Sequence, residues 1–372
     1  MEAGGSGLMR VMIFGCGYSG QAIAECFKAE GAQVSGTARS AEKVAELEAK
    51  RIKGFVFDGS GFGEELLAEL REVTHLIQSI PPMKLKSARP PQPASALLGH
   101  LLPAGEKGNS NLPAPSLLTT EKERNDDGAA LPFSPGGRRW PEGSDEGATR
   151  AQPIQDNSEG DPVLKLIAGN LRTLCPKLEW IGYLSTIGVY GDHGGGWVTE
   201  ETPGSPILGR SIERVDTEDA WAAEADAANV PVAALRLSGI YGPGRNAFVN
   251  LARGTARRII KKDQVFNRIR VEDIGGAALF LGERHMGGIY NVTDDEPGPP
   301  QDVIVEAARL MGVEPPPELD FDTAEMTPMA RSFYGANKRV SNAKIRAAGF
   351  RFRFPNYRMS LAEMWSGERW RG

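Results

Sequence analysis

The chain has 372 residues and a formal net charge of −5, so it lacks the basic character typical of nucleic-acid-binding proteins, and its length predicts one large or two modest domains. No apolar run reaches the roughly 18 residues of a membrane-spanning helix, and the N-terminus matches neither a secretory signal peptide nor a transit peptide. The cysteines, Cys16, Cys26 and Cys175, show no metal or disulfide spacing, which is typical of a reducing compartment. We expect a soluble cytoplasmic protein, with a plastid location left open, and no nucleic-acid or membrane partner.

A glycine-rich turn joins the first predicted strand to the first predicted helix. The apolar strand at residues 11–14 ends at Gly15, and residues 21–28 have a helical pattern. In a G-x-G-x-x-G turn, Gly15 makes the tight turn, Gly17 lets a pyrophosphate approach the backbone, and Gly20 packs the helix on the strand. The free N–H groups at the helix start attract phosphates. We predict dinucleotide binding, rather than a merely structural turn, by Gly15, Gly17, Tyr18, Ser19 and Gly20.

Strands and helices alternate along most of the chain. The further predicted strands are 32–36, 53–57, 75–80, 178–184 and 232–237, and the further predicted helices are 41–51, 64–71, 161–174 and 213–229. This alternation predicts an α/β fold with a doubly wound parallel sheet of the Rossmann type. Shorter elements follow, at 273–281, 288–292, 300–310 and 337–348. We therefore expect a Rossmann domain, 1–83 and 161–244, and a smaller C-terminal α/β lobe on the substrate side, 245–372.

Residues 84–160 interrupt the pattern. They hold ten prolines and nine glycines but only two aromatic residues, Phe133 and Trp140. Such a segment has too little apolar surface to offset the entropy lost on ordering. We expect a disordered insertion in the Rossmann domain. It could dock a partner or act as a lid, or it could be a neutral insertion or a translated intron.

Four motifs resemble those of the extended short-chain dehydrogenase/reductases, the group that includes nucleotide-sugar epimerases. They are the glycine-rich turn, the serine and threonine before VYG at 185–191, Arg236 with YGPG at 241–244, and RIRVED at 268–273, with IYNV at 289–292 in support. The chain is more closely similar to the atypical NAD(P)-binding, epimerase-like branch. The resemblance implies a nicotinamide cofactor and a small polar, sugar-like substrate. The sequence does not identify that substrate, and it leaves the oligomeric state open.

The proton relay of that family is missing at its usual place. Members use a Tyr-x-x-x-Lys pair, in which the lysine lowers the tyrosine pKa and the tyrosine moves the proton. Three possible registers give Arg210 and Arg214, Ser211 and Val215, or Leu208 and Ile212. The family's oxygen-binding residue is kept as Thr186. Its neighbour Tyr190 is our candidate acid, although the equivalent tyrosine usually packs beside the site.

Two other candidates have simpler explanations. His193 is a second possible proton donor, or a solvated loop histidine. The sequence contains one Tyr-x-x-x-Lys, Tyr334 to Lys338, but it lies so late that we interpret it as a coincidence. No Cys or His cluster has the spacing of a metal site, so we predict no metal.

The residues after the second strand indicate which cofactor is bound. NAD-dependent Rossmann proteins usually carry an acid there for the ribose 2′-hydroxyl, but this chain has Arg39. Arg39 can form a charge-assisted fork with a 2′-phosphate, aided by Thr37 or Ser40, which favours NADP over NAD; the alternative is an exposed surface arginine. The family resemblance implies that Asp58 contacts the adenine and that Ser79 and Ile80 line the cofactor site.

Two classes of function remain. The first is an NADP-dependent oxidoreductase or epimerase-like enzyme, in which Thr186 holds a carbonyl oxygen and Tyr190 or a water supplies the proton. The second is a non-catalytic NADP-binding sensor or scaffold that kept the pocket and lost the relay. The retained motifs favour the enzyme, and the missing Tyr and Lys favour the sensor.

Overall fold

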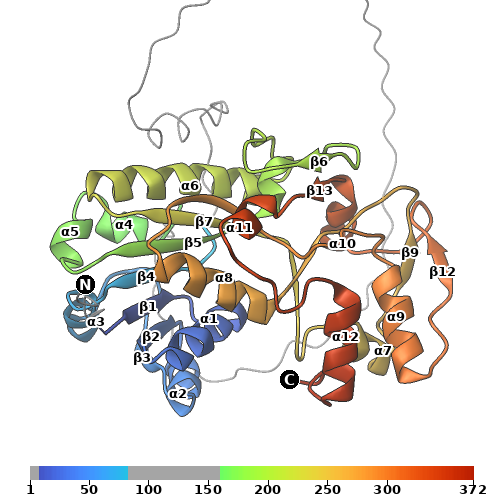
Figure 1. Ribbon diagram of the computed structural model, residues 1–372, viewed down its shortest axis with the longest axis horizontal. Coiled ribbons are helices and arrows are strands. Elements are labelled where there is room, and N and C mark those ends of the chain that lie inside the picture. Colours follow the sequence, from blue (N-terminus) through green and yellow to red (C-terminus); the bar gives the residue numbers. More distant parts are fainter. Residues whose placement is uncertain (1–7, 83–159) are drawn as a thin grey trace, which may run out of the picture. The chain divides into compact units, whose positions relative to one another are not determined.

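A seven-stranded parallel sheet forms the centre of this computed structural model, which describes residues 8–82 and 160–372 (Figure 1). Its strands are β1 (Arg10–Phe14), β2 (Gln33–Ala38), β3 (Lys53–Val56), β4 (His75–Gln78), β5 (Trp180–Thr186), β7 (Val232–Leu237) and β11 (Gly288–Val292). They lie in the order β11-β7-β5-β4-β1-β2-β3. The strand order reverses between β1 and β4, where doubly wound sheets open a crevice for ligands. The predicted Rossmann fold is confirmed.

Helices cover both faces of the sheet (Figure 1). One face carries α1 (Tyr18–Ala29), α2 (Ala41–Ala49) and α8 (Val271–Glu283), and the other carries α3 (Glu64–Leu70) and α6 (Gly209–Ala227). In strand β1, apolar residues stand at consecutive positions and do not alternate with polar ones. Val11 and Ile13 pack in the first core, whereas Met12 and Phe14 pack in the second. A strand buried on both sides needs apolar residues throughout.

The helix predicted at 161–174 is divided in two, α4 (Leu164–Ile167) and α5 (Leu171–Leu174). Gly169 lies between them at φ +72°, which ends the first helix. The Glu224 carboxylate on α6 accepts hydrogen bonds from the backbone N–H groups of Gly169 and Leu171. A distant side chain therefore stabilises the break. The predicted insertion, 84–160, lies outside the described residues except for Gly160.

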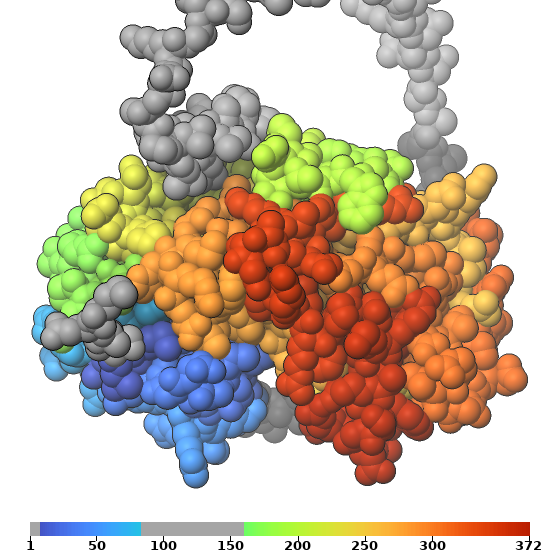
Figure 2. All heavy atoms as spheres, viewed as in Figure 1, coloured from blue at the N-terminus to red at the C-terminus, as the bar shows by residue number. Residues whose placement is uncertain are grey.

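Helices α7 (Ala247–Ala252), α9 (Asp302–Met311) and α12 (Tyr357–Ser366) enclose a separate core. The residues of α9 and α12 lie on the orange and red side of the molecule in Figure 2. Short parallel strand pairs join this region: β8 (Gly239–Tyr241) with β10 (Arg268–Arg270), β9 (Arg258–Ile260) with β12 (Glu318–Asp320), and β6 (Trp197–Val198) with β13 (Arg339–Val340). Among the described helices, none combines the length and apolar character needed to cross a membrane.

Three elements differ from the sequence expectation. Helix α8 and strand β11 belong to the layers of the central sheet, although their residues were expected in the C-terminal lobe. The helix expected at 337–348 is instead strand β13 followed by α11 (Ala343–Ala347). The strand forms because Arg339 and Val340 pair with Trp197 and Val198 of β6. These partners lie about 140 residues earlier, so no local sequence pattern predicts the pairing. Helix α10 (Pro328–Ser332) precedes this segment.

The contact between α1 and α8 gives a direct test of the fold. A methyl group at Gly275 would lie 2.6 Å from both the Ala22 carbonyl oxygen and Cys26 Sγ on α1. Gly275→Ala should therefore lower the free energy of unfolding by about 1–3 kcal/mol. Gly276→Ala is the matched control, because its nearest neighbour is 3.5 Å away in the Phe350 ring and alanine favours helices. Equal effects of the two variants on urea unfolding would contradict this packing.

Candidate functional site

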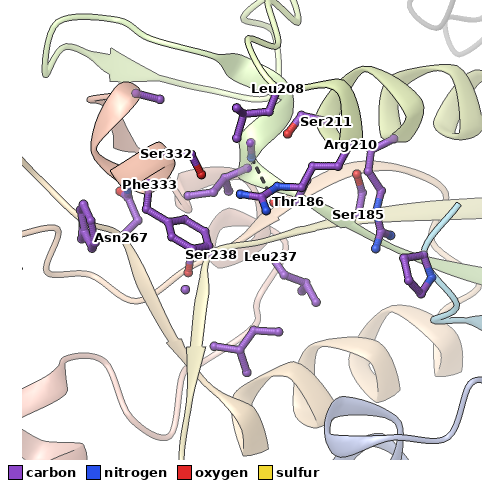
Figure 3. Close-up of a pocket in the computed structure, with 18 of the residues that line it drawn as sticks. Ser185, Thr186, Leu208, Arg210, Ser211, Leu237, Ser238, Asn267, Ser332 and Phe333 are labelled. Carbon is purple, nitrogen blue, oxygen red and sulfur yellow. Dashed lines mark hydrogen bonds between the residues drawn. The ribbon is translucent and has the colours of Figure 1, made fainter. Parts of the chain in front are cut away.

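A cavity of about 660 Å³ lies where the strands end at the carboxyl edge of the sheet (Figure 3). Residues after β4, β5 and β7 form its floor, and the start of α6 forms one wall. A further wall comes from the segment around α10 and β13. The lining includes Ser19, Ser79, Thr186, Arg210, Arg214, Arg245, Phe333 and Lys338.

The glycine-rich turn has the geometry of a phosphate cradle. Gly15 has φ +77°, and a Cβ there would lie 2.8 Å from Ile80 Cγ1. A Cβ at Gly20 would lie 3.2 Å from the Gly15 carbonyl oxygen, so the helix approaches the strand closely. At Gly17 the nearest atom to a Cβ is 4.0 Å away, which leaves open space beside the backbone. The residues present therefore fit a dinucleotide pyrophosphate.

The start of α1 is free to receive an anion. Its N-cap, Gly17, supplies no side-chain cap, and no acidic residue lies in the first turn. The backbone N–H groups there remain available, and the helix dipole favours negative charge. Ser19 lines the cavity. Tyr18 has a structural contact instead: its hydroxyl donates to the Pro243 carbonyl at 3.0 Å and ties α1 to the YGPG segment.

Arg39 lies directly after β2, exposed, and no hydrogen bond or ion pair engages it within the described chain. The end of β2 is held beside the glycine-rich turn, because Gly15 N donates to Thr37 Oγ1 at 2.9 Å. Thr37 is buried, so its hydroxyl serves the turn. Ser40 caps α2 by accepting from Lys43 N. Of the three residues considered for a 2′-phosphate, Arg39 alone is without such an engagement in the described chain.

Asp58 and Ser79 follow the next two strands. The Asp58 carboxylate accepts hydrogen bonds from Ser60 Oγ at 2.6 Å and Ser60 N at 2.9 Å. These bonds lower the pKa of Asp58, so the exposed group is ionised. Ser79 lines the cavity, and its backbone N–H donates to the Phe14 carbonyl, which joins β4 to β1. Both residues lie at the carboxyl edge of the sheet.

Thr186 lines the cavity at the end of β5. Its Oγ1 accepts from Gly188 N at 3.1 Å and caps the short 3₁₀ helix η2 (Ile187–Tyr190). The hydroxyl proton is not used by that bond and can be donated to an oxygen in the cavity. Ser185 does not share this freedom, because its hydroxyl donates to Glu218.

Tyr190 is buried away from the cavity. Its hydroxyl donates to Asn291 Oδ1 at 2.7 Å, and the guanidinium of Arg236 lies 4.8 Å from its ring centroid. Burial raises the pKa of this hydroxyl. His193 is also absent from the cavity lining, and its Nε2 contacts the Tyr190 carbonyl at 3.0 Å. Neither side chain is placed to protonate a ligand in the cavity.

Arg210 and Arg214 line the cavity from the first two turns of α6. They are the pair that one sequence register put at the family's Tyr and Lys positions. The Arg214 guanidinium donates to the Leu184 carbonyl. The Arg210 guanidinium lies 5.0 Å from the ring centroid of Phe333.

Lys338 lines the cavity, although the late Tyr-x-x-x-Lys that contains it was interpreted from the sequence as a coincidence. It is buried and donates to the Gly191 carbonyl at 2.7 Å. Burial lowers its pKa to about 8, against the attraction of Asp192. Tyr334 is not part of the cavity lining, because its ring packs against Phe266 and Phe321. In the late Tyr-x-x-x-Lys, the lysine therefore lines the cavity, whereas the half-buried tyrosine belongs to an aromatic cluster beside it.

The described residues contain no group of three or more His, Cys, Asp or Glu side chains that could hold a metal ion. The cysteines Cys16, Cys26 and Cys175 are free thiols. The polar side chains that line the cavity carry hydroxyl, amide, guanidinium and ammonium groups.

The chain is similar to several known proteins, although no protein-family model matches it. It is 33% identical over 147 residues to protein YeeZ of Escherichia coli K12, and the match covers 38% of this chain and half of YeeZ. A conserved protein of unknown function from Silicibacter pomeroyi has a solved structure that is 33% identical, with a TM-score of 0.69 and 97% and 99% of the two chains covered.

Two more distant structures share the fold alone. The human epimerase family protein SDR39U1, solved with NADPH, is 14% identical, with a TM-score of 0.58 and coverage of 96% and 99%. The UDP-glucuronic acid 4-epimerase of Bacillus cereus, solved with NAD, is 12% identical, with a TM-score of 0.61 and coverage of 96% of each chain.

Proposed function

The chain belongs to the same family as the Silicibacter pomeroyi protein and has the Rossmann fold of NAD(P)-binding, epimerase-like proteins, and we propose that it is an NADP(H)-dependent oxidoreductase or epimerase-like enzyme. Its substrate is a small polar molecule with a carbonyl or an oxidisable hydroxyl, of a sugar-like kind. The Bacillus cereus epimerase acts on a UDP-sugar, which supports this substrate class.

One observation carries the proposal. A single cavity at the carboxyl edge of the sheet joins the start of α1, through Ser19, to Thr186 at the end of β5. The glycine-rich turn leaves room for a pyrophosphate at Gly17. A dinucleotide bound at the α1 end would therefore bring its nicotinamide half toward Thr186, as in other doubly wound sheets.

Arg39 supports NADP(H) rather than NAD(H). It lies after β2, where an acid would be needed to hold the 2′-hydroxyl of NAD, and it has no ion pair in the described part of the chain. A planar guanidinium can make two parallel hydrogen bonds to a phosphate. Since the human epimerase family protein was solved with NADPH and the Bacillus cereus epimerase with NAD, the fold accepts both, and Arg39 is the residue that discriminates.

Thr186 is the residue that we assign to the reacting oxygen. The cofactor would supply or accept the hydride, while the Thr186 hydroxyl donates a hydrogen bond to the substrate oxygen and so stabilises its developing charge. Tyr190 does not donate the proton in this proposal, because its hydroxyl is hydrogen-bonded to Asn291. Tyr190 instead supports the site by packing on Arg236.

A non-catalytic NADP(H) sensor or scaffold is the second candidate. It is favoured by α6, which carries Arg210 and Arg214 in place of the Tyr and Lys relay, and by the buried hydroxyl of Tyr190. A sensor would bind the cofactor at the same cavity and show no turnover with any substrate.

Cofactor preference tests the Arg39 assignment. The isolated protein should bind NADPH more tightly than NADH, and Arg39→Asp should reverse that preference, because the new carboxylate repels a 2′-phosphate and accepts the 2′-hydroxyl. Nicotinamide fluorescence titration measures both affinities. Equal affinities in the wild type would contradict the assignment.

Turnover tests the role of Thr186. NADPH oxidation against a panel of carbonyl and keto-sugar compounds, followed by stopped flow, should fall about a hundredfold in Thr186→Val, a size typical of a lost oxygen-holding donor. Thr186→Ser should keep most of the rate. Tyr190→Phe is the matched hydroxyl deletion and should change the rate by only a few fold, because the hydroxyl faces Asn291. Cofactor binding without turnover on any compound would favour the sensor.

A further inference from the structure

The charges that line the cavity are all positive. Arg210, Arg214, Arg245 and Lys338 are part of the lining, and no Asp or Glu among the described residues is. The chain as a whole has the opposite balance, with 48 acidic and 43 basic residues. The cavity therefore concentrates positive potential in an acidic protein, which favours an anionic occupant.

Arg210 is one of the two exposed cations in this lining, together with Arg245. It lies in the first turn of α6, where the helix dipole disfavours positive charge. Neither an acidic first-turn residue nor a side-chain cap compensates it, since the N-cap is Leu208. No described carboxylate forms an ion pair with it. Figure 3 shows its side chain extending into the cavity on the side of Thr186, and its guanidinium is held over the Phe333 ring.

Arg214 and Lys338 add positive charge, and neither forms an ion pair with a described carboxylate. The Arg214 guanidinium donates hydrogen bonds to neutral oxygens, the Leu184 carbonyl and the Tyr183 hydroxyl. Lys338 donates to a neutral carbonyl, that of Gly191, although only 6% of the residue is exposed, and Asp192 attracts its ammonium without forming an ion pair. A buried ammonium without a carboxylate partner is costly unless a bound anion compensates it.

We propose that the substrate carries an anionic group, a phosphate or a carboxylate, which Arg210 binds in this cavity beside Thr186, with Arg214 and Lys338 adding attraction. The proposal deepens the function proposed above and rests on its assignment of the cavity to substrate. The proposed dinucleotide has other binding groups, the start of α1 for its pyrophosphate and Arg39 for a 2′-phosphate. The α6 cations are therefore available to the substrate. A guanidinium fork suits either oxyanion, because both accept two parallel hydrogen bonds.

Calorimetric titration of the full-length protein saturated with NADPH tests the proposal. The probes are glucose 6-phosphate, glucuronate and neutral glucose. At least one anionic probe should bind, and glucose should bind at least tenfold more weakly, since charge-assisted hydrogen bonds account for about that factor. Whichever anion binds identifies phosphate or carboxylate as the recognised group.

Arg210→Gln should weaken binding of that anion about tenfold or more. Arg253→Gln removes the same charge from an exposed position at the end of α7, outside the cavity, and should leave binding unchanged. Equal binding of glucose and the anions, no binding of either anion, or equal effects of the two variants would overturn the proposal.

NADPH affinity is measured on the same samples and separates the two proposals. If Arg210→Gln loses the anion but keeps NADPH, both stand. If the wild type fails to bind NADPH, the proposed cofactor is wrong, and titration of the anions into the cofactor-free protein still decides the anion site.

Discussion

The buried ion pair between Arg236 and Glu218 is the interaction on which the site depends. Arg236 Nη2 lies 2.7 Å from Glu218 Oε2, and neither side chain is more than 4% exposed. Glu218 also accepts from the Ser185 hydroxyl, and Arg236 packs on the Tyr190 ring. The pair thus links β5, η2, α6 and β7 beneath the cavity. Removing one partner of such a pair typically costs about 3–5 kcal/mol, because the other charge is left buried.

This network fixes the geometry of the cavity above it. It holds the end of β5, which carries Thr186, against α6, which carries Arg210 and Arg214. Tyr190 extends the same network to β11 by its hydrogen bond to Asn291. A tyrosine in a catalytic-looking motif is therefore a structural residue here, and the cavity lining instead includes the Thr186 hydroxyl and four cations.

Local sequence patterns predicted the parts of the site that lie next to the strands. The glycine spacing, the residues after β2 and the position of Thr186 all follow from strand ends, since parallel strands present their carboxyl ends at one edge. Lys338 could not be found this way. It reaches the cavity only because Val340 N bonds Asn267 and its own ammonium bonds Gly191, which are contacts across 73 and 147 residues. The buried hydroxyl of Tyr190 likewise bonds to Asn291, which lies 101 residues later in the sequence.

We propose above all that one cavity holds both an NADP(H) molecule and a substrate. A crystal structure of the full chain with NADP⁺ tests it most directly. We expect the pyrophosphate at the start of α1, the 2′-phosphate on Arg39, and the nicotinamide ring beside Thr186 with open space left toward Arg210. A dinucleotide bound elsewhere, or one whose phosphates occupy Arg210 and Lys338 instead, would contradict this account.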